Sequence, residues 1–157
     1  MNGRTRLIAK LVATSVGFVL VFPVAPATAA PTTLETSLTG AAEVPGPGDA
    51  DAFGAAEIKV NVKKEKVCFT LVVVDLTLPT AAAHIHQGAA GVAGDIVVTL
   101  EAPAEIAGSG IGLATGCVGG QSKPLLRDIK NNPDQYYVNV HTSDFPDGAV
   151  RGQLALA

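Results

Sequence analysis

Aromatic and basic side chains are scarce in this sequence. Its 157 residues include no tryptophan and two tyrosines, and Lys and Arg together number 11 against 14 Asp and Glu. A nucleic-acid interface needs clusters of Lys and Arg to neutralise phosphates, and the one basic cluster, residues 63–66, has the composition of a hairpin turn. Without Trp, a stacking platform for carbohydrate would depend on Tyr136 and Tyr137 alone. The sequence therefore predicts no nucleic-acid partner.

The first 29 residues have the layout of a secretory signal peptide. Three basic residues precede an uncharged apolar run over residues 11–25, and small residues follow it. We place cleavage after Ala29, with Ala27 as the alternative. Residues 30–157 then form one domain with 8 basic and 14 acidic residues, a net charge of −6 (8 − 14), and contain no apolar run long enough to span a bilayer. The sequence predicts a protein that is secreted or held at the cell surface.

Alternation of apolar and polar residues dominates the chain, and helical periodicity is almost absent. Residues 56–62 place Ile, Val and Val on one face, and residues 66–74 are apolar on both faces in their second half, as in a central strand. Further strands are predicted over residues 33–40, 84–86, 95–100, 112–118, 136–142 and 149–156. These segments indicate an all-β fold, an antiparallel Greek-key β-sandwich or barrel of about 7–9 short strands.

One short helix is predicted within residues 122–133. Ser122 is a suitable N-cap and Pro124 falls in the first turn, while Asn132 and Pro133 end the segment. Its apolar stripe consists of Leu125, Leu126 and Ile129. We expect this helix to cover one open end of the sandwich.

The chain has two cysteines, Cys68 and Cys117. In an exported protein an even number of cysteines favours a disulfide. A bridge between them would close a loop of 49 residues and stabilise the fold by about 4 kcal/mol on the chain-entropy model. The alternative is a pair of buried free thiols.

Two of the three histidines, His84 and His86, are two residues apart on a predicted strand. Residues at i and i+2 point to the same face, and His141 has the matching phase on a second strand, opposite to its apolar residues. If the two strands pair, three imidazoles converge, which would suit Zn²⁺ or Cu²⁺. Asp144 and Asp147 could add a carboxylate ligand.

A structural polar cluster is the alternative for these histidines, with hydrogen bonds to a backbone carbonyl or to Glu43 or Asp95. Arg151 has the polar phase of the last strand, and we expect it to pair with a carboxylate, Glu43 or Asp147, near the histidines. The alternative is an exposed arginine in bulk solvent.

Three glycines at 88, 91 and 94 follow the histidine pair. A dinucleotide-binding loop would lead into a helix, whereas a strand follows here. The glycines therefore indicate a compact turn that uses positive φ angles. No serine lies in a nucleophile-elbow context and no pair of acids suggests glycosidase chemistry, so the sequence favours a binding role over catalysis.

Three segments in order resemble the CHRD (chordin-type) domain family: LTGAAEVPGPGDADAFGAAEIKV, AHIHQGAAGVAGDIVVTL and YYVNVHTSDFPDGAVRGQL. They are spread over residues 34–156. The resemblance implies an all-β extracellular domain, a binding or structural module with an unknown protein or surface ligand as partner and no settled activity. The positions that recur in the family are Glu43, Pro45, His84, His86, Gly88, Gly91, Gly94, His141, Gly148, Arg151 and Gly152.

The chain also has a weaker resemblance to copper–zinc superoxide dismutase. That family shares an H-x-H pair on a strand of a Greek-key barrel and an intramolecular disulfide. Its two-metal site needs more histidines than the three present here. The second functional hypothesis is therefore an extracytoplasmic metalloprotein that holds one Cu or Zn ion on His84, His86 and His141.

Overall fold

The structure is a computed structural model and describes residues 30–157. The predicted signal peptide, residues 1–29, lies outside the described residues. All strands in this range belong to one antiparallel sheet. In chain order they are β1 (Thr32–Thr39), β2 (Phe53–Asn61), β3 (Lys66–Val74), β4 (Ala82–Gln87), β5 (Asp95–Leu100), β6 (Ala104–Glu105), β7 (Ile111–Gly119), β8 (Tyr136–His141), β9 (Val150–Gln153) and β10 (Ala155–Leu156).

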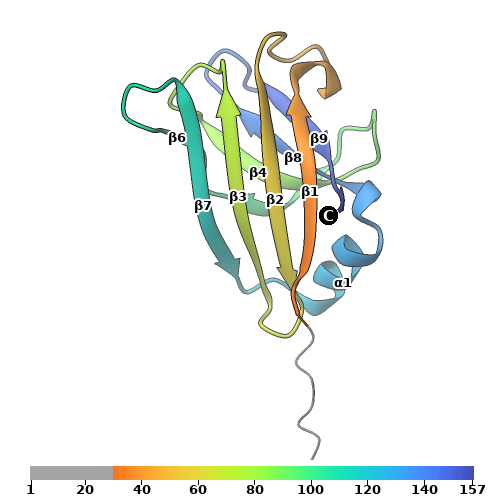
Figure 1. Cartoon of the computed structure of the whole chain (residues 1–157). Helices are drawn as coiled ribbons and strands as arrows, with labels where there is room; N and C mark the ends of the chain where they lie inside the picture. Colours follow the sequence, from red (N-terminus) through yellow and green to blue (C-terminus); the bar gives the residue numbers. More distant parts are fainter. Residues whose placement is uncertain (1–29) are drawn as a thin grey trace, which may run out of the picture.

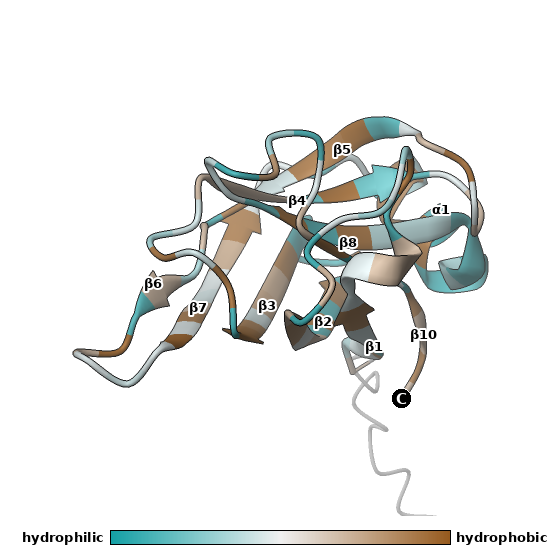
Figure 2. Ribbon diagram, turned by 90° about the horizontal axis from the view of Figure 1, so that it is seen from above, coloured by the Kyte–Doolittle hydropathy of each residue, from teal (hydrophilic) through white to brown (hydrophobic). Residues whose placement is uncertain are grey.

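The sheet curls over itself and encloses the core. Its strand order is β5-β4-β8-β9-β1-β2-β3-β7-β6, and β10 pairs with β1. Figure 1 shows β7, β3, β2 and β1 side by side in one layer, with β4, β8 and β9 crossing behind them, and Figure 2 shows the same two layers from above. Fully buried side chains from both layers fill the space between them, among them Leu34, Ile58, Leu71, Ile85, Val138 and Val150.

The predicted antiparallel all-β fold with one short helix is confirmed. The sheet has ten strands, because it includes two strands of two residues each: β6 pairs with β7 at one edge, and β10 pairs with β1. The single sheet curls so that its two layers face each other across the core, as in the predicted sandwich or barrel. β3 is a central strand between β2 and β7, as its apolar composition predicted, and the charged residues 63–66 lie at the hairpin turn from β2 into β3.

The helix α1 (Lys123–Asn131) lies where it was predicted. The Ser122 hydroxyl accepts a hydrogen bond from the backbone N–H of Leu125, as an N-cap does. Leu126 and Ile129 are fully buried in the core, so the apolar stripe faces inward at one end of the curled sheet (Figure 1). Two 3-10 turns, Gly40–Ala42 and Pro133–Gln135, complete the helical elements of the described range.

Cys68 and Cys117 form the predicted disulfide. They are opposite each other in the register of β3 and β7, on the outer face of the front layer. The bridge therefore joins two strands that also share backbone hydrogen bonds. No helix within residues 30–157 is long and apolar enough to cross a membrane.

Candidate metal centre

Three imidazoles meet on the face of the sheet that points away from the core. β4 and β8 are antiparallel neighbours, and His84 pairs with Asn139 in their register. His84 and His86 project to the same face, while Ile85 between them is fully buried in the core. His141 lies two residues beyond Asn139 and therefore diagonal to His84. The structure thus brings His84, His86 and His141 together, as the strand phases predicted.

The spacing of the three rings is close to that of ligands around one ion. His84 Nδ1 lies 3.2 Å from His141 Nε2, and one potential ligand atom of each ring lies within 4.8 Å of the others. Two nitrogens on a tetrahedral Zn²⁺ are about 3.3 Å apart, given Zn–N bonds of about 2.0–2.1 Å. The pair of His84 and His141 already has this separation, and the His86 ring has to move inward when an ion binds.

Backbone carbonyls fix the ring nitrogens that point away from the cluster. The Nδ1 of His86 lies 2.9 Å from the carbonyl of Gly94, and the Nδ1 of His141 lies 2.9 Å from that of Pro146. A carbonyl only accepts, so both Nδ1 atoms carry the proton and both Nε2 atoms keep a lone pair. A carbonyl partner on the second nitrogen is the usual support for a metal-bound histidine. The Nε2 of His86 is buried without a hydrogen-bond partner among the described residues.

The surroundings keep two of these rings neutral. Burial lowers the pKa of His84 from 6.5 to about 4, with the neighbouring His141 and His86 acting in the same direction. Burial also lowers the pKa of His86. A neutral imidazole is the form that binds a metal ion, because protonation occupies the lone pair. Both rings are therefore available as ligands at neutral pH.

The side chains of Tyr137 and Arg151 stack on one face of the His86 ring. The Tyr137 ring lies parallel to the His86 imidazole, with 4.7 Å between ring centroids and an interplanar angle of 8°. The Arg151 guanidinium lies over the Tyr137 ring, 3.4 Å from its centroid. The Tyr137 hydroxyl accepts a hydrogen bond from the backbone N–H of Gly94, the residue whose carbonyl binds His86. The stack and this residue together orient the His86 ring.

The glycine-rich segment 88–94 is a compact turn between β4 and β5, as predicted, but of its three glycines only Gly91 has a positive φ. Arg151 Nη2 donates to the carbonyls of Ala89 at 3.0 Å and Val92 at 2.9 Å. A side chain on Gly94 would collide with the carbonyl of Gln87, since a Cβ there would lie 1.7 Å from that oxygen. The segment leads into a strand and directs carbonyls at a buried cation, which is the opposite of a phosphate-binding loop.

Arg151 is not paired directly with a carboxylate, and it is not in bulk solvent. Its side chain is 2% exposed, and the carbonyls of the glycine-rich turn take its hydrogen bonds. Glu43, one of its two predicted partners, instead accepts two hydrogen bonds from Asn139 Nδ2, at 2.9 and 3.1 Å. Burial raises the pKa of Glu43 to about 7, although the Asn139 hydrogen bond and the charge of Arg151 lower it.

The aspartates near the cluster do not join it. Asp144 accepts hydrogen bonds from Thr77 at 2.7 Å and from Ser143 at 3.3 Å, and Asp147 is exposed. Within residues 30–157, the group with metal-ligand spacing consists of the three histidines alone. Of the partners predicted for a structural cluster, the histidines bind backbone carbonyls, those of Gly94 and Pro146, and not Glu43 or Asp95.

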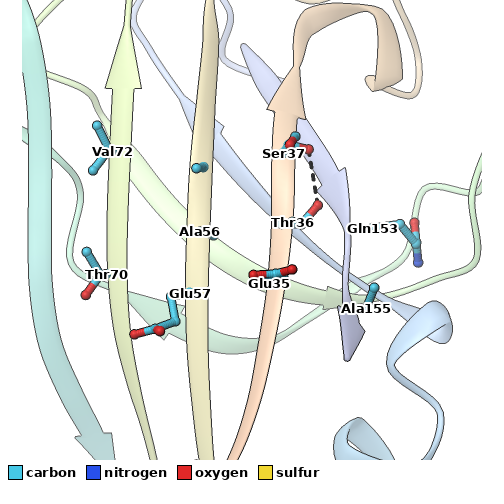
Figure 3. A pocket seen from close by; sticks show the side chains of 10 residues that line it. Glu35, Thr36, Ser37, Ala56, Glu57, Thr70, Val72, Gln153 and Ala155 are labelled. Carbon is cyan, nitrogen blue, oxygen red and sulfur yellow. Dashed lines mark hydrogen bonds between the residues drawn. The ribbon is translucent and has the colours of Figure 1, made fainter. Parts of the chain in front are cut away.

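A cavity of about 600 Å³ lies away from the histidines, on the outer face of β1, β2 and β3 (Figure 3). Glu35 and Glu57 are opposite each other in the register of β1 and β2, and Glu57 accepts a hydrogen bond from Lys59 at 2.6 Å. Both carboxylates are exposed and therefore hydrated. None of the histidines lines this cavity, and the candidate functional site lies on β4 and β8.

Sequence reasoning did not single out three supporting residues: Tyr137, Asn139 and Gln153. Tyr137 and Asn139 have the same strand phase as His141, so alternation along β8 could have identified them. Gln153 has the same phase as Arg151 and donates to the carbonyl of Gly88 at 2.7 Å. Their partners, by contrast, lie on segments distant in the sequence, and alternation carries no information on these.

The sequence that forms this site matches a known protein family. The model of the CHRD domain matches residues 34–154. The chain belongs to the CHRD domain family. The match includes all three histidines, both cysteines and the Glu43, Asn139 and Arg151 side chains of this CHRD domain. No curated protein and no solved structure matched the chain.

Proposed function

We propose that this CHRD domain is an extracytoplasmic binding module whose ligand is a single Cu or Zn ion held by His84, His86 and His141. The observation that carries the proposal is the convergence of three imidazole nitrogens within 4.8 Å of one another. The lone pair of His86 Nε2 is buried beside them without a partner. A buried acceptor of this kind costs about 1–3 kcal/mol, and a bound cation would offset that cost.

The choice of metal follows from the ligands. Three neutral imidazoles suit Zn²⁺ and Cu²⁺, whereas Ca²⁺ and Mg²⁺ prefer oxygen ligands. Three histidines do not suffice for the two-metal site of copper–zinc superoxide dismutase, so the proposal is one ion. The disulfide and the predicted signal peptide support a location outside the cytoplasm, because disulfides persist in oxidising compartments.

The test is elemental analysis of the protein purified from its export route without chelators. We expect about one equivalent of Cu or Zn in the wild type and none in a variant with His84, His86 and His141 all replaced by alanine. Asp147→Asn is the matched control, since Asp147 is exposed and outside the cluster, and it should keep the metal. Circular dichroism of all three proteins shows whether the fold is retained.

A metal content unchanged by the triple substitution would contradict the proposal. So would a folded wild type that binds neither Cu²⁺ nor Zn²⁺ in a calorimetric titration. In that case the hydrogen bond between His84 and His141 would make the cluster a structural one, and the domain a binding or structural module for another partner at the cell surface.

A further inference from the structure

The three histidines occupy one side of the candidate metal centre and leave the other side open. His86 is buried, whereas His84 and His141 are partly exposed. Both partly exposed rings line a cavity of about 460 Å³ next to β4 and β8. An ion bound by the three rings would therefore have His86 on its protein side and the cavity on its outer side.

Nothing among residues 30–157 supplies a fourth ligand from that cavity. The cluster includes no carboxylate or thiolate. Two hydroxyl groups line the cavity, and both are engaged: the Thr142 hydroxyl accepts from the backbone N–H of Phe145 at 3.1 Å, and the Ser143 hydroxyl donates to Asp144 at 3.3 Å. Zn²⁺ sites with three protein ligands keep the fourth position for water or an exogenous molecule.

The walls of the cavity indicate what kind of molecule could take this position. Four of the lining residues are apolar, namely Ala81, Ala82, Ile96 and Pro146, and none is Lys or Arg. Ile96 is 52% exposed, so its side chain offers apolar surface to a ligand in the cavity. Apolar walls favour a ligand with an apolar body, and the bound ion would be the source of positive charge at the cavity.

We propose that the ion bound by His84, His86 and His141 keeps one coordination position open to this cavity, and that the position binds a nitrogen donor with an apolar body. This inference rests on the proposed metal site. The donor atom replaces the water on the metal, and the apolar body covers Ala82, Ile96 and Pro146. The domain thus recognises its small-molecule partner through the metal and the cavity together.

The experiment uses the Co²⁺-loaded protein, because visible absorption of Co²⁺ changes when a ligand replaces water. Co²⁺ stoichiometry is first measured by elemental analysis, and imidazole and 4-phenylimidazole are then titrated. We expect both to shift the spectrum to saturation, with a dissociation constant at least tenfold lower for 4-phenylimidazole.

Two variants distinguish the contribution of the cavity to ligand binding from the binding of the metal ion. Ala82→Leu fills the cavity and should raise the dissociation constant of 4-phenylimidazole at least tenfold with the Co²⁺ stoichiometry unchanged. Ala90→Leu is the matched control, since Ala90 is exposed and does not line the cavity, and it should behave as the wild type.

Different results would refute the open coordination position, the role of the cavity and the metal site itself. Protein that binds one Co²⁺ but shows no spectral change with either imidazole has no open position. Equal affinities for the two imidazoles, or equal effects of the two leucine variants, would refute the role of the cavity. Protein that binds no Co²⁺, Zn²⁺ or Cu²⁺ refutes the proposed function, and this inference with it.

Discussion

Replacing Glu43 with glutamine should remove a loss of stability that the wild type undergoes between about pH 4.5 and 7. Glu43 is 5% exposed, and its carboxylate accepts both of its hydrogen bonds from Asn139. Burial raises the pKa of Glu43 from 4.5 to about 7. Between these values the folded protein holds a proton on Glu43 that the unfolded chain has already released.

The rise in pKa sets the size of the effect. Each pKa unit corresponds to about 1.4 kcal/mol, so the rise from 4.5 to about 7 amounts to about 3 kcal/mol in the free energy of unfolding. The contribution is complete below pH 4.5, decreases as the pH rises, and is lost above pH 7. A glutamine cannot ionise, so this dependence on pH is absent from the variant.

The assay is urea unfolding followed by circular dichroism from pH 4 to 8, with EDTA present to keep metal out of the comparison. The free energy of unfolding of Glu43→Gln minus that of the wild type should increase by about 3 kcal/mol across this range. His84 has the opposite sign, because its lowered pKa of about 4 makes its contribution grow as the pH rises from 4 to 6.5. This contribution is present in both proteins and cancels in the difference.

The matched control is Glu57→Gln, which removes an exposed carboxylate and should give a nearly constant difference. A difference for Glu43→Gln that stays within about 0.5 kcal/mol from pH 4 to 8, the usual range for a surface substitution, would refute the reasoning. It would mean that the Glu43 carboxylate is hydrated or is compensated by the Arg151 charge more fully than the geometry indicates.

Three further predictions concern the supports of the site. Arg151→Lys should lower the free energy of unfolding by about 1–3 kcal/mol and speed hydrogen exchange in residues 88–94, because a lysine cannot keep both the stacking on Tyr137 and the two carbonyl bonds; unchanged exchange would contradict this. Replacing both Cys68 and Cys117 with serine should cost about 4 kcal/mol on the chain-entropy model, and a loss below about 1 kcal/mol in urea unfolding would show that the neighbouring strand pairing already restricts the unfolded chain. Gly148→Ala should be destabilised by more than about 2 kcal/mol, since a Cβ would lie 2.4 Å from Glu43 Oε2 and the residue has a φ of 142°; a thermal midpoint equal to that of the wild type would argue against it.

Most of what could be predicted about the site came from the alternation of side chains along the strands. Because side chains alternate between faces, the spacing of His84 and His86 and the phase of His141 were enough to predict a shared face. Their meeting also required β4 and β8 to be neighbours, which alternation does not specify. The same local reasoning predicted the helix from its Ser122 cap, and the number of cysteines, together with the expected export, predicted the disulfide.

The partners of the charged residues could not be predicted because they depend on contacts between distant segments. Glu43 and Asn139 are 96 residues apart in the sequence, and Arg151 reaches carbonyls about 60 residues before it. Backbone carbonyls also leave no trace in the sequence, since every residue has one. For this reason the sequence could name Glu43 and Asp95 as candidate partners of the histidines, but it could not name the carbonyls of Gly94 and Pro146 that bind them.

Three buried polar atoms without a protein partner among the described residues lie on neighbouring strands: His86 Nε2, Asn139 Oδ1 and Arg151 Nη1. Asn139 pairs with His84 and with Arg151 in the register of β4, β8 and β9. The oxygen of Asn139 needs a donor and the arginine nitrogen needs an acceptor, and a water molecule can supply either. The lone pair of His86 can take a proton or a metal ion. Burial lowers the pKa of His86, which disfavours the proton at neutral pH, and the neighbouring imidazoles add two ligands for an ion. The chemistry of this face therefore favours a metal ion over a proton at His86.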